Sequence, residues 1–233
     1  MNIDVLASSS AGNAYIIGDG KSKILIECGL PFKELQKRSN FTLSHCVACI
    51  ISHSHKDHSK SWSDMSKYMP VYMLKETAVE LGALQYQFKP VDFLRTFTVG
   101  TFDILPIPAK HDVPCAAYII RSQITGERLL FATDYMYLEH SIQQANYALI
   151  EVNYQQKYID EAVNNGAMDI VARRRIMRSH AELQTAINIL KGLDEKKLKA
   201  VYVAHISDRN CNADEVKEEI QKAIGKPVYI CNK

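Results

Sequence analysis

The chain has 233 residues, of which 47% are hydrophobic and 23% charged, and its formal net charge is +2. This is ordinary globular composition, and it excludes a strong overall field that would demand nucleic acid or an anionic membrane as partner. The N-terminus lacks the basic and apolar segments of a signal peptide. No run approaches the roughly 18 apolar residues that span a bilayer, so we expect a cytoplasmic protein with no membrane partner.

The first half of the chain alternates strand and turn patterns. They predict a strand over 3–7, a loop over 8–13 and a hairpin over 14–29 that turns at 18–20. A buried strand over 46–52 leads into a histidine-rich loop, and Trp62, Met65 and Met69 then recur at helical spacing. A strand over 70–74, a helix over 75–83, two strands and a loop over 97–112 and a hairpin over 115–134 follow.

The second half predicts a strand over 147–154, an amphipathic helix over 181–192 and a strand over 199–207. Asn212 and Glu215 have capping-box spacing before a helix that runs to about Ile224, and a closing strand covers 227–233. We see no repeat or linker. The pattern indicates one α/β domain over residues 1–233, with mostly antiparallel strands in the first half.

The six cysteines lie mostly inside apolar runs, which is typical of reduced, buried thiols. Cys46 and Cys49 form a C-x-x-C pair that could serve redox chemistry or zinc. Because the pair lies within a predicted strand, we favour core packing.

The stretch ISHSHKDHSK, residues 51–60, crowds three histidines and an aspartate into six positions. Further histidines and an aspartate follow predicted strands, where side chains can converge. The full candidate set is His53, His55, Asp57, His58, His111, Asp134 and His205. Imidazoles with carboxylates favour zinc, manganese or iron over a structural cysteine site. Seven ligands suit two ions about 3.5–4 Å apart with a bridging carboxylate and a bridging hydroxide.

The H-x-H-x-D-H loop, followed by a distant histidine, an aspartate and a final histidine, resembles the metallo-β-lactamase-fold hydrolases. The resemblance covers nearly the whole chain and implies an αββα sandwich with two divalent metal ions, Zn²⁺ or Mn²⁺. It implies that one metal is held by His53, His55 and His111. The other would be held by Asp57, His58 and His205. Asp134 would bridge them, and Glu27 would orient a ligand histidine where the family usually has aspartate.

Other stretches resemble nucleases of this fold. YALIEVNY resembles the strand that ends in a glutamate in RNase Z, which implies a role for Glu151. SHAELQTAINIL resembles the H-S-T loop of RNase Z and aligns His180, and AHISDRN resembles its T-H-x-S-x-R-Y motif. The runs SSSAGNAYII and VARRRIMRSHAEL are closer to the small YycJ/WalJ-like nucleases, although Ser179 replaces a glycine there.

Phosphodiester cleavage needs a proton for the leaving alkoxide. We expect a histidine held by a carboxylate to donate it, and our hypothesis pairs His180 with Glu151. With Asp57, these residues form the expected catalytic set. In the arginine-rich run, Arg174 and Arg178 would share a helix face and are our first choices for substrate contact. A solvated helix face is an equal alternative.

The leading hypothesis is therefore a dinuclear-metal phosphodiesterase. Its substrate is single-stranded nucleic acid or a cyclic nucleotide, the latter as in compact phage-encoded members of the fold that destroy immune signals. A thioester or lactam hydrolase of the same fold is the alternative, and a non-catalytic scaffold is a third. Because many relatives dimerise, we also expect a homodimer.

Overall fold

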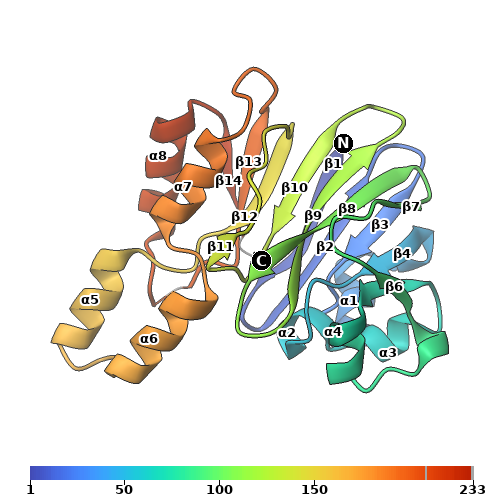
Figure 1. The fold of residues 1–233 in the computed structure, drawn as a ribbon, viewed down its shortest axis with the longest axis horizontal. Coiled ribbons are helices and arrows are strands. Elements are labelled where there is room, and N and C mark those ends of the chain that lie inside the picture. The colour runs from blue at the N-terminus through green and yellow to red at the C-terminus, as the bar shows by residue number, and fades with distance from the viewer. Residues whose placement is uncertain (208, 232–233) are drawn as a thin grey trace.

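Figure 1 shows a computed structural model of the chain, in which two β-sheets pack face to face and helices cover their outer sides. The structure describes residues 1–207 and 209–231. This is the αββα sandwich expected from the sequence. No helix in these ranges is long and apolar enough to cross a membrane.

The first sheet has six strands in sequence order: β1 (Asn2–Ser9), β2 (Gly12–Gly18), β3 (Lys23–Ile26), β4 (Cys46–Ile50), β5 (Val71–Leu74) and β6 (Lys89–Val91). Strands β1 to β3 pair antiparallel, which confirms the predicted hairpin. From β3 to β6 the pairing is parallel, because helical crossovers replace hairpins there. The crossovers contain α1 (Phe32–Arg38), α2 (Lys56–Ser59), α3 (Trp62–Met65) and α4 (Lys75–Glu80).

The second sheet is ordered β11 (Tyr137–Leu138), β8 (Phe102–Lys110), β9 (Cys115–Ser122), β10 (Arg128–Ala132), β12 (Tyr147–Glu151), β13 (Ala200–Ala204) and β14 (Val228–Ile230). The short β7 (Phe97–Val99) pairs with β8. Strands β10, β12, β13 and β14 are parallel, so their carboxyl ends meet at one edge. The predicted closing strand is confirmed over 228–230, while residues 232 and 233 lie outside the described residues.

Two helices cover the outer face of the second sheet: α7 (Leu183–Lys191) and α8 (Ala213–Ile224). The apolar side of α7 is buried as predicted. The side chain of Asn212 accepts backbone hydrogen bonds at the start of α8, which confirms the predicted helix start. Before α7, α5 (Gln156–Asn164) and α6 (Ile170–Ser179) form a helical hairpin that projects from the sandwich (Figure 1).

The core between the sheets is built from large, fully buried side chains, with Tyr15 and Phe131 in edge-to-face contact at 5.5 Å between ring centres. Further clusters lie between each sheet and its helices. Cys46 and Cys49 are buried in one of these clusters, as the core-packing interpretation predicted.

Candidate active site

The residues expected to carry chemistry follow strand ends of both sheets. The histidine-rich loop follows β4 of the first sheet, whereas His111, Asp134 and His205 follow β8, β10 and β13 of the second. Glu27, Asp134 and His205 adopt left-handed backbone conformations, with φ of 62°, 53° and 52°. Non-glycine residues rarely adopt this conformation, and such strain gathers at functional sites because the surrounding structure enforces it.

One group of ligand atoms that could hold a metal comes from His53, His55, His111 and Asp134. Nε2 of His53 lies 3.6 Å from Oδ2 of Asp134, and Nε2 of His111 lies 3.9 Å from the same oxygen. The sequence predicted these three histidines as one metal's ligands, and the fold brings them together.

A second group comes from Asp57, His58, Asp134 and His205. Nε2 of His58 lies 3.4 Å from Oδ2 of both Asp57 and Asp134, and Nε2 of His205 lies 3.5 Å from Oδ2 of Asp57. A tetrahedral zinc ion with bonds of about 2.05 Å needs ligand atoms roughly 3.3 Å apart. The spacing therefore fits a metal, and Asp134 belongs to both groups, as a bridging residue must.

Two imidazole nitrogens support the same interpretation. Nε2 of His53 and Nε2 of His205 are buried and have no hydrogen-bond partner within the described part of the chain. A buried polar atom without a partner is costly, so these nitrogens are suited to a cation. The ring of His53 is held from the other side, since its Nδ1 lies 2.8 Å from the Ser52 hydroxyl.

The charge states of the candidate ligand histidines differ between the two groups. Burial lowers the pKa of His53, which favours the neutral imidazole that binds metals. Burial opposes charge on His58 and His205 as well, but the Asp134 carboxylate raises the pKa of both above the usual value. Conversely, burial opposes charge on Asp134, yet the two histidines keep its pKa below the usual range. A metal ion would therefore displace protons from these histidines.

A carboxylate–histidine pair lies beside the second group. Oε1 of Glu151 is 2.7 Å from Nδ1 of His180 and 2.9 Å from Nδ1 of His205. Burial opposes the charged form of His180, but the Glu151 carboxylate, with a further contribution from Asp134, raises the pKa of the imidazole above its usual value. The pairing expected from the sequence is thus present, although Glu151 also contacts a metal-ligand candidate.

Two further contacts orient the histidines. Nδ1 of His111 donates to the carbonyl of Ser179, 2.6 Å away, so the last residue of α6 fixes its ring. Glu27 is fully buried, accepts the backbone N–H of Ser52 at 3.2 Å and lies 3.7 Å from Nδ1 of His58. The Glu27 carboxylate thus faces the candidate ligand His58, but the two side chains are too far apart for a hydrogen bond.

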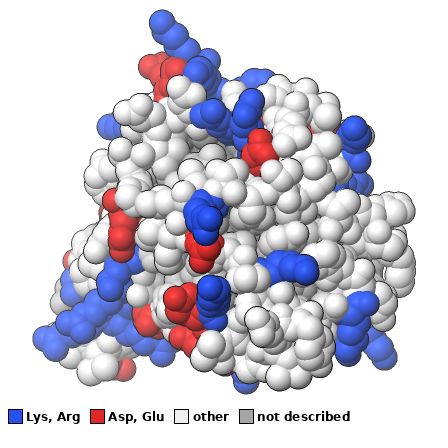
Figure 2. Space-filling model, turned by 45° about the vertical axis from the view of Figure 1, so that its right-hand side comes forward, with Lys and Arg blue, Asp and Glu red and all other residues white. Residues whose placement is uncertain are grey.

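The groups open into a cavity of about 620 Å³, lined by Ser9, Ser10, His55, Asp57, His111, Asp112, Asp134, Asn153, Arg175, Ser179, His180, His205, Ile206, Ser207 and Arg209. Arg174, Arg175 and Arg178 of α6 are all exposed, but only Arg175 lines this cavity. Arg173 instead forms an ion pair with Asp160 that joins the two helices of the hairpin. Figure 2 shows basic and acidic side chains mixed over the face it presents.

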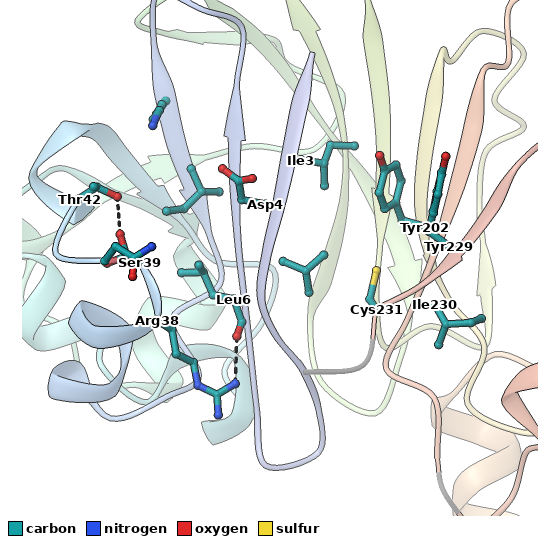
Figure 3. Close-up of a pocket in the computed structure, with 14 residues that line it drawn as sticks. Ile3, Asp4, Leu6, Arg38, Ser39, Thr42, Tyr202, Tyr229, Ile230 and Cys231 are labelled. Carbon is teal, nitrogen blue, oxygen red and sulfur yellow. Dashed lines mark hydrogen bonds between the residues drawn. The ribbon is translucent and has the colours of Figure 1, made fainter.

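A second hollow of about 570 Å³ lies along the outer edge of β1, beside Arg38, Tyr202 and Tyr229 (Figure 3). None of the candidate metal ligands lines it. The cavity with the histidines is therefore the candidate active site.

Residues 22–206 match the family described as the beta-lactamase superfamily domain. The chain belongs to this family. It is 24% identical over 225 residues to exodeoxyribonuclease WalJ of Streptococcus pneumoniae, covering 88% of this chain and 81% of that protein. Among solved structures, YhfI from Bacillus subtilis superposes with a TM-score of 0.75 at 17% identity, covering 98% and 95% of the two chains. The short form of human tRNase Z superposes with a TM-score of 0.67 at 13% identity, covering 99% and 96%.

Membership in the beta-lactamase superfamily confirms the fold predicted from the H-x-H-x-D-H loop. With the histidine and aspartate clusters, it makes the protein a metal-dependent hydrolase.

Several residues of the site were not singled out from the sequence. Asp112 lies 3.0 Å from Nε2 of His111, and its position next to that histidine was the available signal. Asn153 and Arg209 line the cavity, and both lie in stretches that resemble RNase Z. Asn13 contacts Nε2 of His58 at 3.1 Å from the SSSAGN loop. The resemblance of SSSAGNAYII to small nucleases was the available signal, but the partner of Asn13 lies 45 residues away in the chain.

Proposed function

We propose that the protein is a two-metal phosphodiesterase that cleaves single-stranded DNA. The observation that carries this proposal is the 2.7 Å contact between Glu151 and His180 at the edge of the metal-ligand clusters. Bound divalent cations would supply Lewis acidity and an activated water at the phosphorus. The ligand sets proposed from the sequence would hold two such ions, Zn²⁺ or Mn²⁺, with Asp134 shared.

The chain's own residues would supply the proton. A departing alkoxide is strongly basic, so its release is accelerated by a positioned acid. Glu151 keeps His180 oriented and charged, and His180 donates a proton to the leaving oxygen. A thioester releases a thiolate that needs no such donor, which is why this pair favours phosphodiesters over thioesters.

Two cavity arginines support an anionic substrate. Arg175 and Arg209 line the same cavity as the histidines and would contact phosphate oxygens. Arg174 and Arg178, proposed from the sequence, are exposed on the same helix and would contact phosphates farther along a strand. The named activity of the WalJ relative, an exodeoxyribonuclease, supports DNA as the polymer.

A cyclic mononucleotide is the second candidate substrate, because a cavity of about 620 Å³ is within the usual size of small-ligand sites. The test is one chromatographic assay of the zinc- or manganese-loaded protein on cyclic mononucleotides, short single-stranded DNA and RNA, and an activated thioester. Shortened DNA supports the proposal. Linear monophosphate from cyclic nucleotides, with intact oligonucleotides, would establish the second candidate. Thioester cleavage alone would overturn both.

We infer a homodimer in solution from the exposed aromatic side chains on the helical side of the first sheet. Phe41, Tyr68 and Tyr86 are 72%, 68% and 82% exposed, and a subunit interface would cover these aromatic side chains. Light scattering after size-exclusion chromatography tests this, and a mass of one chain would overturn it.

A further inference from the structure

A chain of hydrogen bonds inside the sandwich joins two of the three segments that supply the second group of ligands, those of His205 and of Asp57 and His58. The backbone N–H of His205 donates to the Ser8 hydroxyl at 2.9 Å. Ser8 lies 2.9 Å from the hydroxyl of Tyr15, which in turn donates to Oδ1 of Asn13 at 3.2 Å. The Tyr15 hydroxyl donates its hydrogen to Asn13. Ser8 must therefore donate its own hydrogen to Tyr15, so the hydrogen bonds all run in one direction, from His205 to Asn13.

The other end of this chain reaches the histidine-rich loop. Nδ2 of Asn13 donates to the carbonyls of Asp57 at 3.3 Å and Ser9 at 3.1 Å, and it lies 3.1 Å from Nε2 of His58. When Nε2 of His58 takes a metal, the amide keeps its two carbonyl acceptors. The chain Ser8–Tyr15–Asn13 therefore spans from His205 on the second sheet to Asp57 on the first.

A β-bulge makes this connection possible. In Figure 3, Ile3 points to one side of β1, and Asp4 and Leu6 point to the other, as in a regular strand. The pairing of β1 with β2 then shifts register between Val5 and Ala7. Leu6 and Ala7 both pack in the cluster under the helices. The extra residue turns Ser8 to the inner side, where Tyr15 lies, whereas regular alternation would have turned it away.

The three side chains are buried as a positioning role requires. Ser8, Tyr15 and Asn13 are 3%, 0% and 0% exposed. Burial raises the pKa of the Tyr15 hydroxyl well above its usual value, so it stays protonated as a donor. Every polar atom in the chain of bonds has a partner, and such a network fixes one arrangement because any shift leaves a buried group unpaired.

We propose that Ser8, Tyr15 and Asn13 are positioning residues that hold His205 and the turn at Asp57 and His58 at the spacing one metal requires. This inference rests on the proposed two-metal site and concerns the metal shared by Asp57, His58 and His205. The left-handed backbone at His205 needs an anchor, and its N–H has one in Ser8. Removing the Tyr15 hydroxyl leaves Oδ1 of Asn13 without its donor and the Ser8 hydroxyl without its acceptor, which loosens both side chains.

The test is a zinc titration of chelator-stripped protein, followed by calorimetry, with metal content measured after gel filtration. Tyr15→Phe should bind the first equivalent as the wild type does and the second roughly 10- to 100-fold more weakly, the range for residues that orient metal ligands. Tyr118→Phe is the matched control. Tyr118 is also fully buried between the sheets, and its hydroxyl donates to the Ile51 carbonyl at 2.8 Å, away from this chain of bonds.

Tyr118→Phe should bind the second equivalent of zinc with the same affinity as the wild type. Equal weakening in both variants, or none in Tyr15→Phe, would overturn the inference. If Tyr15→Phe does not fold, Ser8→Ala takes its place, with the same selective loss expected and the same contrary outcome. The titration measures metal affinity and not activity. The positioning role can therefore be disproved while the phosphodiesterase activity is confirmed, and it can be confirmed while the substrate proves to be different.

Discussion

Oε1 of Glu151 lies 2.7 Å from Nδ1 of His180. One buried carboxylate therefore orients the proposed proton donor, and the same oxygen contacts the metal-ligand candidate His205 at 2.9 Å. This one carboxylate oxygen therefore contacts both the proposed proton donor for the leaving group and a candidate metal ligand.

Replacing His180 by alanine should impair only substrates that need a proton on departure. With a DNA phosphodiester, we expect kcat to fall roughly 100- to 10,000-fold, the usual contribution of a general acid. With a p-nitrophenyl phosphodiester, whose leaving group departs without a proton, the loss should be below about tenfold. Steady-state kinetics on both substrates measures the difference, and equal losses would contradict the assigned role.

Glu151→Gln should move the pH profile of the metal-saturated enzyme. The carboxylate raises the pKa of His180, and a general acid works only while protonated. Without the charge the pKa falls, so the decline of kcat on the alkaline side should begin at lower pH. Profiles of wild type and variant on single-stranded DNA measure this, and coincident profiles would exclude Glu151 as the residue that tunes the donor.

Arg175→Ala should raise KM for single-stranded DNA about tenfold or more, because it removes a charge-assisted contact in the cavity. Arg174→Ala, one position away but outside the cavity lining, is the comparison and should change KM less on a short oligonucleotide. The reverse ranking would restore the sequence-based choice of Arg174 over Arg175.

Gly29→Ala should disrupt the histidine-rich loop. A Cβ at Gly29 would lie 1.6 Å from the backbone oxygen of Asp57, so the loop must move. We expect loss of bound zinc and a lower melting temperature. Gly18→Ala is the control, since its nearest contact, Cγ of Lys23, is an ordinary 3.5 Å away. Wild-type zinc content in Gly29→Ala would show that the loop tolerates the shift.

Asp19→Asn should destabilise the fold away from the active site. One oxygen of Asp19 accepts the backbone N–H groups of Lys21 and Ser22, and the other accepts the hydroxyls of Thr101 and Ser122. Burial opposes its charge, but these donors lower its pKa. At neutral pH we expect the free energy of unfolding to fall by about 1–3 kcal/mol.

The pH dependence of that loss has a fixed sign. Since the pKa of Asp19 is lower in the folded state, its stabilisation is present above the unfolded pKa of about 3.9 and is lost as pH falls through the folded value. Urea unfolding of metal-free wild type and variant should therefore converge in acid. A difference that grew in acid would contradict this account.

The metal-ligand candidates could be predicted from sequence because their pattern is local: four of them lie within His53 to His58, and the others directly follow predicted strands. Which α6 arginine lines the cavity could not be predicted from the sequence, because it depends on how that helix is rotated against the cavity. The parallel pairing from β3 to β6 was missed because the sequence pattern predicted neither α1 nor the three-residue β6. The role of Ser8 could not be predicted either, because it depends on a β-bulge that is defined by the pairing of β1 with β2.

The candidate ligands are divided between the two sheets, so metal binding would affect the stability of the protein as well as its activity. His53, His55, Asp57 and His58 come from the first sheet, and His111, Asp134 and His205 come from the second. Each of the two groups of candidate ligands takes ligand atoms from both sheets, so a metal ion bound at either group would link the two sheets. A metal at 100 times its Kd adds about 2.7 kcal/mol against unfolding. Metal supply would then govern how long each molecule survives proteolysis, as well as how fast it works.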